Sequence, residues 1–254
     1  MSSIEIAGIT FVCVFGAALL GMSLRTVVPE HHLSDKSQST VTVGMGLIAT
    51  MAALVLGLLT GSAKSSFDTQ DSEIKQMSAN LILLDRTLAH YGQETKNIRD
   101  QIRRAIAYRL AATWPEDSRA ARLDISENDA AVEGIEDEIR ALSPRNDVQR
   151  ALQSRAEQIT GEVLRTRWLM VGQQAGNAIQ PPLLVALVFW LAALFASFGL
   201  FAPRNATVIA VLFVSALSVS GAILLILEMN QPFHQGLVRV SSAPLRYTLE
   251  HLGK

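Results

Sequence analysis

The sequence predicts an all-α membrane protein with four transmembrane helices and a polar helical domain on one side of the bilayer. Of its 254 residues, 49% are hydrophobic and 18% are charged, so the apolar residues must be concentrated in particular segments. They gather in four runs, at about 4–24, 42–61, 183–201 and 206–227, and each run approaches the roughly 20 residues that cross a bilayer as a helix. Residues 62–180 are nearly charge-balanced and poor in glycine, which favours long helices over a sheet.

Residues 1–61 are expected to form the first two transmembrane helices, joined by a short external loop. The only early charge is Glu5, so the positive start that is typical of a signal peptide is missing, and we expect a retained helix. The loop contains four residues that could ligate a metal: Glu30, His31, His32 and Asp35. Because adjacent histidines point in different directions and no further Cys or His completes a set, we expect a solvated loop without a metal or cofactor.

The second apolar run carries a stripe of small or weakly polar side chains. Spacings of three and four residues place the following positions on one face of a helix: Thr42, Gly46, Thr50, Ala53, Gly57 and Gly61. Such a face can line a pore, where threonine hydroxyls offer weak polar contacts to ions. It can also be a packing face that lets two helices approach closely. The residues by themselves favour the packing interpretation.

The same run passes without a proline into a charged segment with a heptad-like repeat of apolar residues. This continuity predicts one helix from Thr42 to Trp114, so that the second membrane helix continues into a long cytoplasmic helix. Asp85 and Arg86 lie within the repeat, and we interpret them as a surface or inter-helix ion pair that contributes well under about 1 kcal/mol if exposed.

Residues 62–180 are therefore expected to form a helical hairpin with a short helix between its arms. Pro115 is expected to end the first arm, before a turn or short loop over 115–125. Ser143 and Pro144 indicate the start of the second arm, as an N-cap followed by proline in the first helical position. The second arm would run antiparallel to the first, back towards the membrane.

Residues 181–228 predict the third and fourth transmembrane helices, and 229–254 a tail that either packs on the helical domain or plugs the mouth of a pore. Four crossings place both termini and the domain on one side. The basic residues near the membrane on that side are Lys64, Lys75, Arg165, Arg167, Arg239 and Arg246, against Arg25, Lys36 and Arg204 on the other. This bias predicts cytoplasmic termini and a cytoplasmic domain.

Catalysis and nucleic-acid binding are not expected. The net charge is only −1 and the single Cys13 lies inside an apolar run, so neither a nucleic-acid partner nor a disulfide framework is indicated. The glycines of the second run follow no strand and make no phosphate loop, and the histidines lack metal-protease spacing. The membrane runs also lack the buried charged residues of proton-coupled transporters. We expect no catalytic residues, cofactor or metal.

Three stretches resemble the bestrophin-like membrane proteins of bacteria and plants, an uncharacterised-domain family. They are GMGLIATMAALVLGLLTG (44–61), SANLILLDRTLAHYG (78–92) and EMNQPFHQGLVRVSSAPL (228–245). The last is the most specific, and its motif positions are Glu228, Asn230, Pro232, Phe233, Gly236 and Pro244. The family often carries an acidic residue before Pro-Phe, where this chain has Asn230.

The resemblance implies a homo-oligomeric channel-like assembly, because bestrophins are oligomeric anion channels with cytosolic termini and pore-lining second helices. The expected partners are the lipid bilayer, further copies of this chain and small inorganic ions. The alternative is a non-conducting scaffold or signalling protein that acts through its helical domain. Both need the inter-helix packing that the heptad-like repeat provides, so the sequence leaves the choice open.

Overall fold

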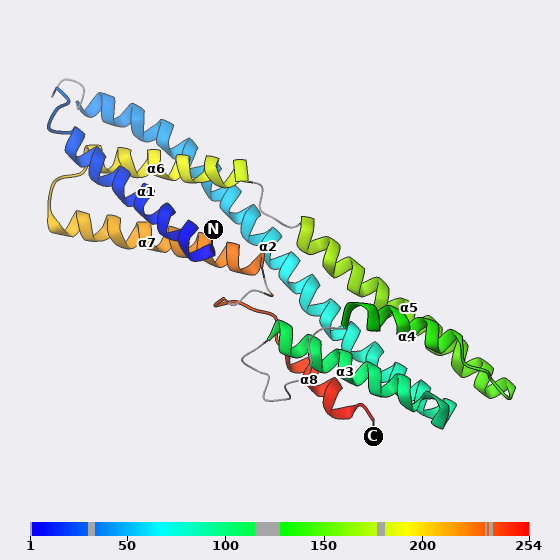
Figure 1. The fold of residues 1–254 in the computed structure, drawn as a ribbon. Coiled ribbons are helices and arrows are strands. Elements are labelled where there is room, and N and C mark those ends of the chain that lie inside the picture. Colours follow the sequence, from blue (N-terminus) through cyan, green and yellow to red (C-terminus); the bar gives the residue numbers. More distant parts are fainter. Residues whose placement is uncertain are drawn as a thin grey trace. The chain divides into compact units, whose positions relative to one another are not determined.

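The computed structural model describes residues 2–29, 34–114, 128–176, 181–231, 233 and 236–253. Within these ranges every regular element is a helix (Figure 1). The chain forms two compact units. The membrane unit comprises Met1–Phe67, Asn177–Pro232 and Gly236–Val238, and the helical unit comprises Asp68–Gly176, Phe233–Gln235 and Arg239–Lys254. The all-α prediction is confirmed.

The membrane unit contains α1 (Ser3–Leu24), the first part of α2 (Asp35–Tyr91), α6 (Pro181–Phe201) and α7 (Ala206–Met229). Among the described residues, these four helices are long and apolar enough to cross a membrane. They coincide with the four apolar runs. The start of α7 is set by Asn205, whose side-chain oxygen accepts a hydrogen bond from Val208 N at 2.8 Å, as expected of an N-cap.

The helical unit contains the rest of α2, the short 3-10 helix η2 (Gln93–Thr95), and the helices α3 (Lys96–Thr113), α4 (Asn128–Arg140), α5 (Asp147–Gly176) and α8 (Ala243–His251). Three hydrogen bonds join α2 and α5 in reverse order: Gln173 to Glu73 (2.7 Å), Asn80 to Glu162 (3.2 Å) and Gln149 to the Tyr91 carbonyl (3.0 Å). The two long arms are therefore antiparallel, as the sequence predicted.

The prediction of one helix from Thr42 to Trp114 is wrong beyond Tyr91. Gly92 has a φ of 140°, a conformation that L side chains rarely adopt, and it ends α2. The Thr95 hydroxyl donates a hydrogen bond to the Leu88 carbonyl at 2.6 Å, and the Gly92 N–H reaches the same carbonyl only at 3.5 Å, so the hydroxyl reinforces this helix end. The chain then reverses, and α3 runs back beside the domain part of α2 (Figure 1).

Two further local predictions need correction. Helix α5 begins at Asp147, and its cap is Asn146, whose side-chain oxygen accepts from Gln149 N at 2.8 Å, rather than Ser143. Asp85 is 1% exposed and its partner is Arg99, which donates two hydrogen bonds to its carboxylate at 2.7 and 3.0 Å. The hydrogen bond to Asp85 raises the pKa of the Arg99 guanidinium. The ion pair is inter-helical, as one interpretation held, but Asp85 is buried.

The C-terminal tail packs on the helical unit from residue 239 onwards, as the simpler of the two interpretations held. Trp114 is buried, and its indole N–H donates to the Val240 carbonyl at 3.0 Å. Thr248 Oγ1 lies 3.3 Å from the Ser78 carbonyl and donates to it, and Gly253 N donates to Asp85 at 3.3 Å. The predicted turn over 115–125, and the loop residues Glu30, His31 and His32, lie outside the described residues.

Candidate functional site

The membrane unit is built on a close contact between α1 and α6. Gly21 of α1 faces the Ala196 carbonyl of α6, and Gly199 of α6 faces the Ala18 carbonyl of α1. A Cβ atom at either glycine would overlap the facing backbone. The two glycines therefore allow a contact in which backbone meets backbone, the arrangement that small residues make possible in membranes.

The ends of these two helices are joined by reciprocal hydrogen bonds. Arg25, just after α1, donates to the Ala202 carbonyl after α6, and Arg204 donates to the Met22 carbonyl of α1. Each guanidinium thus satisfies a carbonyl at the C-terminal end of the partner helix. Helix α7 joins this pair through Phe213, which stacks edge-on against two aromatic rings of α1. Helices α1, α6 and α7 therefore pack together into one group of three helices, here called the frame.

Residues 35–67 of α2, here called the membrane half of α2, present three different faces. One face packs on the frame, and its members are Met45, Ile48, Ala49, Ala52, Val55, Leu56, Leu59 and Ala63. A second face carries large apolar side chains that are exposed: Val43, Leu47, Met51, Leu54 and Leu58. At 3.6 residues per turn, the predicted stripe lies between these two faces.

All six stripe residues are exposed in the single chain: Thr42, Gly46, Thr50, Ala53, Gly57 and Gly61. An added Cβ at any of the three stripe glycines would meet nothing within 4 Å. The structure therefore leaves the six stripe residues exposed along α2, and they do not form a packing face within one chain. Packing between copies and lining of a pore both remain compatible with this geometry.

The stripe is apolar with isolated hydroxyls. Thr50 Oγ1 donates to the Gly46 carbonyl at 2.9 Å, so its proton is used within the helix and its lone pairs are presented outwards. No charged residue occurs between Thr42 and Gly61. Such a surface can offer weak acceptor contacts and open space, but it has no group for acid-base or nucleophilic chemistry.

The C-terminal motif does not form one site. Glu228 is buried at the end of α7 and accepts a hydrogen bond from Leu237 N at 2.8 Å, and Gly236 leaves room for its carboxylate. Asn230 ends α7 by donating from its backbone N–H to Ile226. These contacts hold the turn at 236–238 in the membrane unit.

The other motif residues belong to the helical unit or lie outside the described residues. The Phe233 ring packs edge-on against Trp114, with ring centroids 6.3 Å apart, and Pro244 lies in the first turn of α8. Pro232 lies outside the described residues. Residues of the motif therefore make contacts in both the membrane unit and the helical unit. The acidic residue of the motif in this chain is Glu228.

Sequence reasoning did not single out the glycine contact or the two arginines that hold the membrane frame. Gly21 lies three residues after Ala18, and Gly199 three after Ala196, so each helix carries a small pair of the kind found at close helix contacts. That signal was available in the sequence, although it does not say which helices meet. The pairing of Arg25 and Arg204 with carbonyls of another helix left no sequence signal.

Comparison with known proteins identifies the nature of this fold. The sequence profile of the Bestrophin-like domain matches residues 12–245. Two point mutants of a bacterial bestrophin homologue from Klebsiella pneumoniae are similar in structure, each at 15% identity. The first mutant structure matches with a TM-score of 0.59, and the match covers 95% of this chain and 97% of the homologue. The second matches with a TM-score of 0.58, and the match covers 99% of both chains. A search of curated proteins finds no match.

Proposed function

The chain belongs to the bestrophin-like family, and from this premise we propose that several copies assemble around a common axis into an ion channel lined by the stripe on α2. The observation that carries the proposal is the exposure of all six stripe residues on a helix whose neighbouring face packs on the frame. Small side chains at an axis leave room for ions, and the large apolar face of α2 can be covered by lipid or by a neighbouring copy.

The proposed assembly is an integral protein of the bacterial inner membrane, with termini and helical unit in the cytoplasm. The larger number of basic residues near the membrane on that side supports this orientation. The permeant species are small inorganic ions, and anions are proposed by analogy with bestrophins. The role is non-enzymatic, because the stripe offers hydroxyls and open space without a titratable group.

The experiment is a flux assay on the purified assembly in liposomes, with halide and potassium as the measured ions. Thr50→Leu places a larger apolar side chain on the stripe, whereas Met51→Leu exchanges side chains of nearly equal volume on the adjacent large apolar face and controls for substitution in this part of α2. We expect Thr50→Leu to reduce flux while the size of the assembly is unchanged, and Met51→Leu to leave flux near that of the wild type.

Dissociation of the assembly by Thr50→Leu would instead identify the stripe as an inter-copy packing face. A well-folded assembly that conducts neither ion would favour the scaffold or signalling role, exerted through the helical unit.

A further inference from the structure

The helical unit contains a cavity of 430 Å³. Its walls come from α2, α3, α4 and α5 together with Trp114 and two residues of the tail, Phe233 and Leu245. This volume is within the roughly 300–1,000 Å³ that is typical of small-molecule sites. It is large enough for one extended organic ligand within the helical unit.

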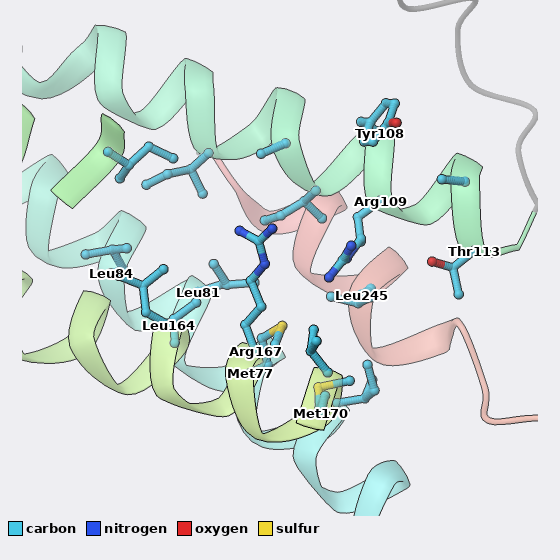
Figure 2. A pocket seen from close by; sticks show the side chains of 18 of the residues that line it. Met77, Leu81, Leu84, Tyr108, Arg109, Thr113, Leu164, Arg167, Met170 and Leu245 are labelled. Carbon is cyan, nitrogen blue, oxygen red and sulfur yellow. The ribbon is translucent and has the colours of Figure 1, made fainter. Parts of the chain in front are cut away.

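Most of the lining is aliphatic. Leu81 and Leu84 of α2 and Leu164 of α5 lie along one side, and Met77 of α2 and Met170 of α5 also line the cavity (Figure 2). Methionine side chains are flexible and polarisable, so they adapt to ligands of varied shape. A surface of this composition favours an alkyl chain, because burial of each CH₂ group contributes about 0.8 kcal/mol.

Two arginines contribute positive charge to the lining of this apolar space, and neither is fully buried in it: Arg109 is exposed and Arg167 is half-buried. Arg109 extends from α3 and Arg167 from α5, and the two guanidinium groups point into the gap between the helices (Figure 2). Guanidinium groups bind planar carboxylates through paired hydrogen bonds. Because the arginines come from facing helices, a single carboxylate between them could contact both.

We propose that this cavity binds a long-chain fatty acid, with its carboxylate between Arg109 and Arg167 and its alkyl chain against the leucine and methionine side chains. The combination of a single apolar volume with two convergent cations matches a ligand that has one chain and one anionic head. The proposal concerns the helical unit alone and does not depend on ion conduction by the membrane unit.

Trp114 gives a direct reporter, because it lines the cavity and is 3% exposed. Trp168→Phe and Trp190→Phe remove the other two tryptophans. The full-length assembly in lipid nanodiscs is titrated with dibrominated stearate, whose bromine atoms quench indole fluorescence on contact. We expect saturable quenching of Trp114 by the acid and much weaker quenching by its methyl ester, which lacks the charge.

The arginines are tested with matched controls on the same two helices. Arg109→Gln and Arg167→Gln should each weaken the apparent Kd about tenfold, as loss of a hydrogen bond to a charged group does. Arg104→Gln on α3 and Arg165→Gln on α5 change arginines that are exposed, as Arg109 is, but that do not line the cavity, and they should leave the Kd unchanged. Circular dichroism and the size of the assembly verify that each variant folds.

Four outcomes would overturn the proposal. The first is an absence of saturable quenching, which is also the result if another copy of the chain fills the cavity. The second is equal quenching by the acid and the ester, and the third is equal affinity in the lining and control variants. The fourth is equal quenching by dibrominated phosphatidylcholine in the nanodisc, which would identify a membrane lipid as the occupant.

Discussion

The two halves of α2 differ in how much of their surface the chain itself covers. In the membrane half, the buried residues are Ala52, Leu59 and Ala63, and most other side chains are exposed. In residues 68–91, the domain half, buried positions recur on nearly every turn, among them Leu84 and Leu88, which are at most 2% exposed. The single helix α2 is therefore mostly exposed in its membrane half, and the rest of the chain buries much of its domain half.

This difference shows which part of the chain is complete by itself. The domain half buries apolar side chains and also the carboxylate of Asp85, for which α3 supplies the partner Arg99. The membrane half leaves both the stripe and a large apolar face open. Its exposed apolar face requires lipid or another copy as a cover, because contiguous apolar surface of this kind marks an interaction site.

The largest expected effect tests the covered half. Arg99→Met removes the partner of a buried carboxylate, and the loss of such a partner costs about 3 kcal/mol of unfolding free energy. The matched control is Arg104→Met on the exposed side of α3, which should change the stability little. The thermal unfolding midpoint of the purified protein measures both. Similar midpoints for the two variants would show that the Asp85–Arg99 pair does not stabilise the helical unit.

A smaller effect separates covered from uncovered glycines within the membrane unit. Gly199→Ala places a methyl group against the Ala18 carbonyl, so α1 and α6 must separate, and we expect a loss of about 1–3 kcal/mol. Gly57→Ala on the stripe meets nothing within 4 Å and should not destabilise the chain. Unfolding midpoints in one detergent compare the two. Equal losses would mean that the stripe is covered after all.

The smallest of these effects concerns the turn at which the covered half ends. Gly92→Ala forces a side chain into a backbone conformation with positive φ that essentially only glycine adopts, and it should cost about 1 kcal/mol. Gly161→Ala in α5 has open space in a helix, where alanine is favoured over glycine, so it should be neutral or slightly stabilising. Denaturant midpoints measure the difference. A stable Gly92→Ala variant would argue that the chain can relax at this turn.

The membrane helices were predictable because some 20 consecutive apolar residues have few other structures available to them. The break at Gly92 was missed because apolar positions continue at helical spacing across it, through Tyr91, Thr95 and Ile98. Helices α2 and α3 bury their apolar faces in the same core, so the repeat persists although the chain reverses. The partner of Asp85 was hidden for the same reason, since Arg99 reaches it only after the reversal.

The stripe was predictable from its spacing, but its environment was not. Small residues at intervals of three and four occur both at Gly21 and Gly199, where backbones touch, and at Gly46 and Gly57, where a Cβ would meet open space. The sequence pattern is similar in the two cases. Only the fold shows which glycines another helix of the same chain covers.

The central claim is that the stripe faces water while the neighbouring face of α2 does not. The most direct test replaces the exposed Cys13 by serine and introduces either Thr50→Cys or Met51→Cys. A charged, membrane-impermeant methanethiosulfonate is then added to the assembly in liposomes, and both labelling and ion flux are followed. Thiolates react readily in water and poorly in apolar surroundings. We predict that Thr50→Cys is labelled and that its flux falls, while Met51→Cys is protected; labelling of Met51→Cys with protection of Thr50→Cys would contradict the account.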